Sequence, residues 1–172
     1  MQIKKILQLS LIFTLSFILI GCTSSKKDET NNNQTASKIL QIEFKNLSGE
    51  TKQLSEFDKP LVINSWAGWC SFCKEELKVF AEVQQNMNDK ITIIAINRGE
   101  SKQKAVGYLE NLEVKNDLTY LLDKKDRFYR KIGGIAMPET IFINKQGKKV
   151  FHQRGPLDEK QLKQIINKKF EA

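Results

Sequence analysis

The segment Val62-Ile-Asn-Ser-Trp-Ala-Gly-Trp-Cys-Ser-Phe-Cys-Lys-Glu-Glu76 decides how this chain is expected to fold. It opens with an almost continuous apolar run, which is typical of a buried strand. From Phe72 onward, apolar residues recur at helical spacing to about Asn88. Two cysteines separated by two residues, Cys70 and Cys73, therefore lie where a strand passes into a helix. That arrangement is a recurrent setting for a redox-active dithiol.

The same Cys-x-x-Cys spacing could also be half of a structural zinc site, so the remaining potential ligands matter. Such a site needs four Cys or His ligands, and the chain contains Cys22, Cys70, Cys73 and His152 in total. We expect His152 to be a surface residue of an edge strand and not a catalytic base, because it lies in a hairpin far along the chain. Too few ligands remain, so we predict no metal site and no cofactor.

The N-terminus has the three-part pattern of a secretory signal. Lys4 and Lys5 precede an apolar stretch over residues 6–20, which is shorter than the roughly 20 residues needed to span a bilayer. Leu19-Ile-Gly-Cys22 resembles the lipobox of bacterial lipoproteins, which implies cleavage before Cys22 and acylation of its sulfur. The alternative is an ordinary secretory signal with a Cys near the cleavage site by chance. We expect residues 1–21 to be a lipoprotein signal peptide.

The segment 22–37 is predicted to be the lipidated Cys followed by a flexible tether, because no large apolar residue follows Cys22 within it. Residues 38–172 match one compact domain that is long enough to bury a core. The formal net charge of +8 comes mostly from scattered Lys without interleaved aromatic residues. We therefore expect a solvated basic surface and no nucleic-acid partner.

Strand and helix patterns alternate along the domain. We expect strands over residues 39–46, 61–66, 91–96, 118–122, 139–144 and 148–153. Helices are expected over residues 72–88, 101–112 and 124–132. A final amphipathic helix should follow Asp158-x-x-Gln161, which resembles an N-terminal capping box. Strands that alternate with helices and close in a hairpin predict an α/β sandwich.

These features together resemble the thioredoxin superfamily, and residues 62–76 are especially similar to the TlpA/ResA-like membrane-tethered thiol-disulfide oxidoreductases. The resemblance covers nearly the whole of residues 38–172. It includes Gly133-Gly-Ile-Ala-Met-Pro-Glu-Thr140, which is similar to the family's cis-proline loop, and Gly155-Pro-Leu-Asp158, which opens the last helix. It implies a thioredoxin-like three-layer sandwich, with a mixed central sheet and helices on both faces.

Each position of the motif has a chemical task in that reading. The helix N-terminus would stabilise the Cys70 thiolate, so Cys70 is the expected nucleophile. Cys73 lies one turn further in and would resolve the mixed disulfide. The resemblance implies that Pro138 is cis and that the backbone of Met137 pairs with an incoming peptide. Trp69 is expected over the active-site surface as a substrate-binding residue.

Asn64, Trp66 and Glu76 of the same segment also bear on the chemistry of the dithiol. Asn64 stands where thioredoxins have a buried Asp, so that proton acceptor is absent. Glu76 stands where ResA-like proteins have a Glu that tunes the thiols, and a buried carboxylate there could take the proton of Cys73 as a catalytic group. The alternative is that Glu75 and Glu76 are acidic residues favoured by the helix dipole. Trp66 is equally compatible with a core role.

The sequence therefore predicts an extracytoplasmic thiol-disulfide oxidoreductase that reduces disulfides of exported partners. Ser71 and Phe72 place no His and no positive charge between the cysteines, which favours a reductase or a moderate potential. The resemblance implies apocytochrome c or methionine sulfoxide reductase clients and a CcdA/DsbD-type membrane electron donor. We expect a monomer that is lipid-anchored on the extracytoplasmic face of the cell membrane. Two alternatives remain, a thiol oxidant for oxidative folding and a non-catalytic metal-binding lipoprotein.

Overall fold

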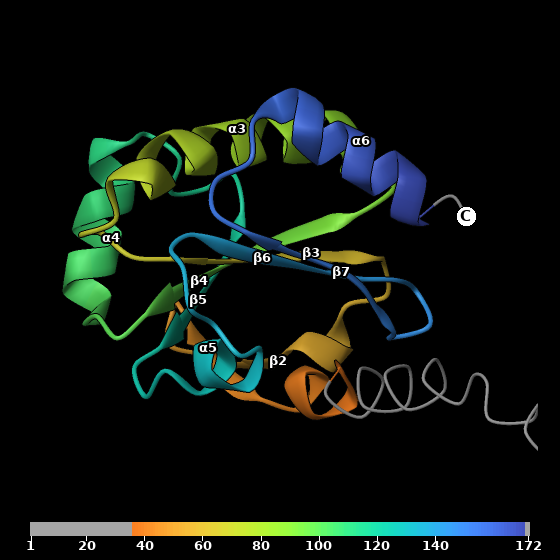
Figure 1. Cartoon of the computed structure of the whole chain (residues 1–172). Coiled ribbons are helices and arrows are strands. Elements are labelled where there is room, and N and C mark those ends of the chain that lie inside the picture. The colour runs from red at the N-terminus through yellow and green to blue at the C-terminus, as the bar shows by residue number, and fades with distance from the viewer. Residues whose placement is uncertain (1–35, 171–172) are drawn as a thin grey trace, which may run out of the picture. The chain divides into compact units, whose positions relative to one another are not determined.

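The computed structural model describes residues 36–170, and within them a mixed sheet of seven strands is covered by helices on both faces (Figure 1). The strand order across the sheet is β2-β1-β5-β4-β3-β6-β7. The strands are β1 (Glu43–Asn46), β2 (Thr51–Gln53), β3 (Leu61–Trp66), β4 (Thr92–Arg98), β5 (Thr119–Asp123), β6 (Glu139–Ile143) and β7 (Lys149–Arg154). The helices are η1 (Leu54–Glu56), α3 (Ser71–Met87), α4 (Lys102–Asn111), α5 (Arg127–Lys131) and α6 (Glu159–Phe170).

Strand β3 lies inside the sheet, parallel to β4 and antiparallel to β6. All six of its residues are buried because layers of helix cover both of its faces. Leu61 and Ile63 pack into the cluster that contains Phe128 of α5. Val62 packs on the opposite side into the cluster that contains Phe80 of α3. This alternation confirms the predicted three-layer sandwich.

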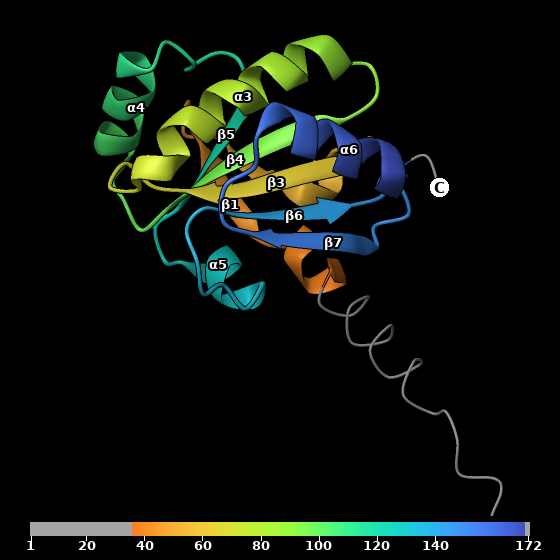
Figure 2. The same cartoon turned by 45° about the horizontal axis from the view of Figure 1, so that its top comes forward.

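The helical layers are visible in two views. Helices α3 and α6 lie against one face of the sheet, whereas α5 lies against the other (Figures 1 and 2). Leu162 and Ile166 of α6 are buried in the same cluster as Phe80. The predicted capping box opens α6, because Gln161 N–H donates to Asp158 Oδ1 (2.7 Å) and Asp158 N–H donates to Gln161 Oε1 (3.1 Å).

The sheet topology brings three loops to one edge. The parallel strands β3, β4 and β5 present their carboxyl ends there, with Trp66 opposite Asn97 and Arg98 opposite Asp123. Strand β6 runs antiparallel to β3, so its first residue, Glu139, pairs with Ser65 near the same edge. The loop before the dithiol, the segment after β4 and the loop before β6 therefore meet.

The first predicted strand is wrong over residues 39–42. Residues 36–40 are helical, Ile42 N–H donates to Ile39 O (3.1 Å), and β1 begins only at Glu43. Ile39, Leu40 and Ile42 all pack against one core cluster, which a helical turn allows and strand alternation does not. The hairpin itself is confirmed, because β1 and β2 pair antiparallel around a turn with Gly49 at φ +95°.

Helix α5 is shorter than predicted. Asp126 takes a left-handed conformation at φ +57°, and the buried carboxylate of Asp123 accepts from Phe128 N–H (2.7 Å), so the helix begins at Arg127 instead of Lys124. Its predicted end is confirmed at Gly133, which has φ +69° and donates its N–H to Arg130 O.

Residues 36 and 37, which the sequence assigns to the tether, lie in the first helical turn of the structure. The rest of the predicted tether, the predicted signal peptide at 1–21 and the predicted lipidation site Cys22 lie outside the described residues. In the part of the chain that the structure describes, no helix has the length and apolarity that a membrane crossing requires.

Candidate active site

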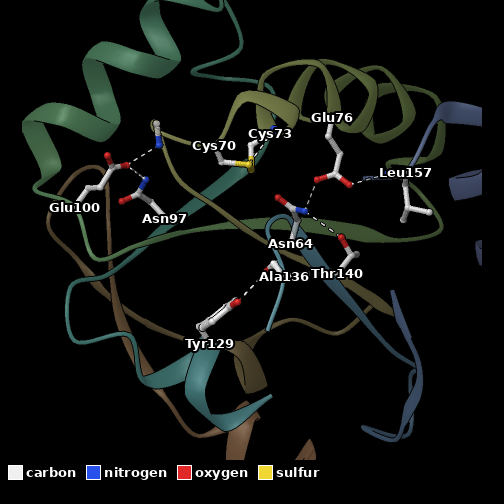
Figure 3. Close-up of a disulfide and its surroundings, with 11 residues drawn as sticks. Asn64, Cys70, Cys73, Glu76, Asn97, Glu100, Tyr129, Ala136, Thr140 and Leu157 are labelled. Carbon is white, nitrogen blue, oxygen red and sulfur yellow. Dashed lines mark hydrogen bonds between the residues drawn. A yellow bond between two sulfur atoms is a disulfide. The ribbon is translucent and has the colours of Figure 1, made fainter. Parts of the chain in front are cut away.

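Cys70 and Cys73 form a disulfide at the N-terminus of α3, with Cα atoms 5.4 Å apart (Figure 3). Cys70 is the N-cap residue, and its sulfur accepts from Cys73 N–H (3.2 Å). The turn before it is closed by Cys70 N–H, which donates to Ala67 O (3.0 Å). A sulfur at this place faces the free N–H groups of the first helical turn, which favour a thiolate there.

The two cysteines differ in exposure. Cys70 is 5% exposed and Cys73 is fully buried. Trp69 and Phe72, which flank Cys70, are 64% and 63% exposed. Ile135, in the loop before β6, is the remaining large apolar side chain that the described residues leave exposed. The surface beside Cys70 therefore carries large apolar side chains, whereas Cys73 has no surface in contact with solvent.

Trp66 is a core residue. Its ring is fully buried, stacks on Tyr108 with centroids 5.6 Å apart and meets Tyr120 edge-on at 6.3 Å. This packing fixes the end of β3 just before the dithiol loop. Of the two alternatives that the sequence left open, the core role holds for Trp66, while Trp69 lies on the surface beside Cys70.

Glu76 lies one helical turn after Cys73 on α3 and points into the protein, and its exposure is only 2%. Asn64 Nδ2 donates to Glu76 Oε2 (2.7 Å), and Leu157 N–H donates to Glu76 Oε1 (2.9 Å). Asn64 Nδ2 also donates to Thr140 Oγ1 (3.0 Å). Glu75, in contrast, is exposed. A helix-surface explanation therefore fits Glu75 but not Glu76.

Burial raises the pKa of Glu76 from 4.5 to about 7, and the hydrogen bonds from Leu157 and Asn64 only partly oppose this rise. The carboxyl group can therefore exchange a proton near neutral pH. When ionised, it would disfavour a second negative charge on a nearby sulfur. Both properties are what a proton-exchanging group beside a dithiol needs.

The peptide bond between Met137 and Pro138 is cis, as the resemblance to the thioredoxin superfamily implies. Pro138 is buried, and its carbonyl accepts from Gly155 N–H (2.9 Å) of the segment that leads to α6. Met137 is partly exposed and packs against the core cluster that contains Cys70 and Cys73. The structure thus brings Met137 and Pro138 to the dithiol from a distant part of the sequence.

A buried carboxylate that the sequence analysis missed holds this loop. Glu139 is fully buried, and its Oε1 accepts from the N–H groups of Ile135 (2.6 Å) and Ala136 (2.7 Å). Its Oε2 lies 2.6 Å from Nε2 of His152 on β7. His152 does lie on an edge strand, but it is partly buried and paired rather than free on the surface. Its pKa is lowered by burial, and the interaction with Glu139 opposes that shift.

Tyr129 of α5 holds the same loop from the other side. Its hydroxyl donates to Ala136 O (2.8 Å). The Arg98 guanidinium lies 3.5 Å from the Tyr129 ring centroid and 5.9 Å from that of Trp69, and it forms an ion pair with Asp126. Arg98, to which the sequence assigned no role, therefore connects the cis-proline side of the site with the tryptophan beside Cys70.

Glu100 performs the corresponding task for the loop before the dithiol. Its Oε2 accepts from Gly68 N–H (2.8 Å) and from Asn97 Nδ2 (2.7 Å). A Cβ atom at Gly68 would lie 3.3 Å from Glu100 Oε1, so the carboxylate sits closely against this backbone. Both loops that border the disulfide are thus held by a carboxylate that binds main-chain N–H groups (Figure 3 shows Glu100).

Comparison with known proteins identifies the family. The family model described as Redoxin matches residues 34–166, which is most of the chain. The chain belongs to the Redoxin family. Within that family, a disulfide-forming Cys70 and Cys73 pair at a helix N-terminus makes the chain a thiol-disulfide oxidoreductase.

Relatives of known function agree with this assignment. The chain is 24% identical over 167 residues to thiol-disulfide oxidoreductase ResA of Bacillus cereus, which covers 96% of this chain and 94% of ResA. It is 28% identical over 118 residues to the thiol:disulfide interchange protein DsbE of Haemophilus influenzae, with 67% of this chain and 62% of DsbE covered.

Solved structures show the same thioredoxin-like fold. A secreted disulfide oxidoreductase of Mycobacterium tuberculosis matches with a TM-score of 0.67 and 20% identity, over 76% of this chain and 98% of the other. Etrx1, an exposed lipoprotein thioredoxin of Streptococcus pneumoniae, matches with a TM-score of 0.67 and 22% identity, over 74% and 98%.

The site residues that the sequence predicts within the described part of the chain come from two segments, the start of α3 and the cis-proline loop, and Met137 of that loop packs against the cluster that contains Cys70 and Cys73. They are Trp69, Cys70, Cys73, Glu76, Met137 and Pro138. The sequence analysis gave no site role to Arg98, Glu100, Tyr129 and Glu139 and placed His152 on the surface, whereas the structure has Glu100, Tyr129 and Glu139 bonded to the loops beside the disulfide and His152 paired with Glu139. Two signals were available for three of them. Arg98 ends β4 and Glu100 follows it, at the carboxyl edge of parallel strands where sites form. Glu139 directly follows the cis-proline.

Proposed function

We propose that this protein reduces disulfides of exported partner proteins, with Cys70 as the nucleophile, Cys73 as the resolving thiol and Glu76 as the proton acceptor. The Cys70 thiolate attacks the partner disulfide and displaces one of its sulfurs as a thiolate. Cys73 then attacks Cys70, which releases the reduced partner and leaves the Cys70–Cys73 disulfide. Two electrons pass from the dithiol to the partner, and Glu76 receives the proton of Cys73.

The single observation that carries the reducing direction is the buried carboxyl group of Glu76, one helical turn after Cys73. Strong oxidants of this chemistry have a reduced form that is stabilised by an acidic thiol. A carboxylate with a pKa of about 7 opposes such a thiolate. The stabilised thiolate that would make the disulfide a strong oxidant is therefore disfavoured.

The apolar surface around Cys70 supports a protein partner. Trp69 and Phe72 of the dithiol motif and Ile135 of the cis-proline loop are exposed. Exposed aromatic residues of this kind are typical of protein contacts. We propose that Trp69 and Met137 bind the partner segment that carries the disulfide, with Pro138 shaping the groove.

The N-terminal sequence supports a location outside the cytoplasm. The apolar segment before Cys22 has the pattern of a lipoprotein signal, and one structural neighbour is an exposed lipoprotein. We propose that acylated Cys22 anchors the protein to the membrane, and that a CcdA/DsbD-type membrane protein reduces it there. A Cys22→Ser variant should be released from the membrane and keep its dithiol activity.

The reduction potential tests the direction. The full-length protein is equilibrated with glutathione redox buffers, and the Cys70–Cys73 pair is quantified by thiol alkylation and mass spectrometry. A potential below about −220 mV is expected for a reductant, whereas a value near −120 mV would mark an oxidant and overturn the proposal.

Trapping identifies the partner. In the Cys73→Ala variant the mixed disulfide between Cys70 and a partner cannot be resolved, so partners should accumulate on Cys70. We expect exported proteins, with c-type apocytochromes and methionine sulfoxide reductases as the leading classes. The matched control is the Cys70→Ser/Cys73→Ala double variant, which should capture nothing; equal capture by both would contradict the proposed attack.

A further inference from the structure

The side chain of Asn64 lies beneath the first turns of α3. On β3, Val62, Asn64 and Trp66 share one face of the sheet because alternate residues of a strand point to the same side. Trp66 packs in a cluster with Cys73, and Val62 packs in a cluster with Phe80, further along α3. Asn64 therefore lies between these two contacts, under the helical turn that carries Cys73 and Glu76.

Only half of this buried amide has hydrogen-bond partners. Asn64 is fully buried, and both hydrogens of Nδ2 are used, on Glu76 Oε2 (2.7 Å) and Thr140 Oγ1 (3.0 Å). Asn64 Oδ1 is also buried, yet no group among residues 36–170 donates to it. A buried carbonyl oxygen without a donor is unusual because such a group loses its hydrogen bonds to water without replacement.

The orientation of the amide explains what the oxygen could bind. The amide nitrogen is turned to the carboxylate of Glu76, and the oxygen is turned to the side on which the disulfide lies (Figure 3). The reverse orientation would place two oxygens against each other, since Glu76 Oε2 is an acceptor when ionised. The hydrogen bond to Glu76 therefore fixes the direction of Oδ1.

Reduction supplies the missing donor. The structure has the cysteines joined, so neither sulfur carries a proton. Two glutathione molecules reduce the pair to a dithiol and become glutathione disulfide, and a proton then resides on each sulfur. The S–H of fully buried Cys73 needs an acceptor inside the protein, and a thiol is a weak donor that suits a carbonyl oxygen.

We propose that Asn64 Oδ1 accepts the S–H of Cys73 in the reduced protein, so that Asn64 favours the dithiol over the disulfide. Asn64 is then a positioning residue, which acts through Cys73 and connects it to Glu76. By favouring the dithiol, Asn64 raises the reduction potential of the Cys70–Cys73 pair, which opposes the lowering attributed to the Glu76 carboxylate. The inference deepens the function proposed above and rests on its dithiol chemistry, but not on the partner or the direction of electron flow.

The first test compares two variants of the full-length protein in glutathione buffers at pH 7. Asn64→Leu removes the acceptor at similar volume and should lower the equilibrium constant for reduction about tenfold. Thr140→Val removes the other partner of Asn64 and keeps Oδ1, so its constant should stay within about twofold of the wild type. Equal constants for the two variants would overturn the proposal.

The second test does not depend on how Asn64→Leu folds. The infrared S–H stretching band of Cys73 is obtained as the difference between the Cys70→Ser and Cys70→Ser/Cys73→Ser proteins. A hydrogen-bonded thiol absorbs at lower frequency than a free one, so we expect a lowered band that Thr140→Val leaves in place. A band at the free-thiol frequency would disprove the inference. A wild-type potential near −120 mV would instead refute the reducing role and leave the ratio between the variants untouched.

Discussion

The two sides of the Cys70–Cys73 disulfide are built from opposite kinds of side chain. On the outer side, Trp69 and Phe72 are exposed and apolar. On the inner side, Glu76 and Asn64 are buried and polar. A buried Glu and neighbouring large aromatic side chains exposed to solvent are each uncommon, so both sides of the site depart from the usual arrangement. The difference teaches that contact with a partner belongs to the outer side and proton control to the inner side.

The largest effect on disulfide exchange is expected from replacing Cys70, which lies between the outer and the inner side. Cys70→Ser should abolish disulfide exchange with both glutathione and protein substrates, because no thiolate is then left at this position to attack the substrate disulfide. Turnover of a disulfide-linked reporter protein measures this loss. Cys22→Ser is the control and should keep full turnover; residual exchange by Cys70→Ser would mean that Cys70 is not the nucleophile.

On the inner side, the buried carboxyl group of Glu76 can be tested through the pH dependence of the free energy of unfolding. The pKa of Glu76 is raised from 4.5 to about 7 in the folded protein, so the folded state binds more protons than the unfolded state between these values. The free energy of unfolding should therefore fall as the pH rises from about 4.5 to about 7, by about 3 kcal/mol at most.

Urea unfolding of the oxidised protein at pH 5 and pH 8 measures this slope. In Glu76→Gln the residue no longer titrates, so its contribution to the slope should vanish. Glu75→Gln is the matched control, because its side chain is exposed and its removal should leave the slope unchanged. A wild-type protein whose stability rises over this range would contradict the raised pKa of Glu76.

A third change loosens the outer side without touching its apolar residues. Glu139→Ala leaves the N–H groups of Ile135 and Ala136 without their acceptor and His152 without its partner. We expect a loss of about 2 kcal/mol in the free energy of unfolding. The KM for a protein substrate should rise, while the glutathione equilibrium at the cysteines should change little. A shifted equilibrium with an unchanged KM would place the role of Glu139 on the inner side.

The smallest effect on stability is expected at the exposed aromatic residues. Trp69→Ala and Phe72→Ala should each change the free energy of unfolding by less than about 0.5 kcal/mol. Reduction of a protein substrate should slow by about fivefold, because large aromatic side chains carry much of the contact energy at interfaces. Reduction of glutathione disulfide by the same variants is the control. If both reactions slow equally, these side chains tune the dithiol instead of binding the partner.

The sequence predicted the parts of the molecule that depend on local pattern. The apolar run of β3 followed by helical spacing placed Cys70 and Cys73 at a strand-to-helix junction, and both were found there. The resemblance to a known family placed a cis-proline at Pro138. Boundaries failed where side-chain contacts outweighed the pattern. Ile39 turned out to lie in a helix, and Asp123 delayed the start of α5.

Only the tertiary structure decided how the polar groups are used. The sequence left Glu76 open between a helix-surface residue and a buried acid, and the answer came from Asn64 and Leu157, which lie 12 and 81 residues away. The pairing of Glu139 with His152 depends on the register between β6 and β7 in the same way. Hydrophobic periodicity reports which face of an element is covered. It does not report which distant donor meets a given acceptor, and in this site those long-range hydrogen bonds set the environment of the dithiol.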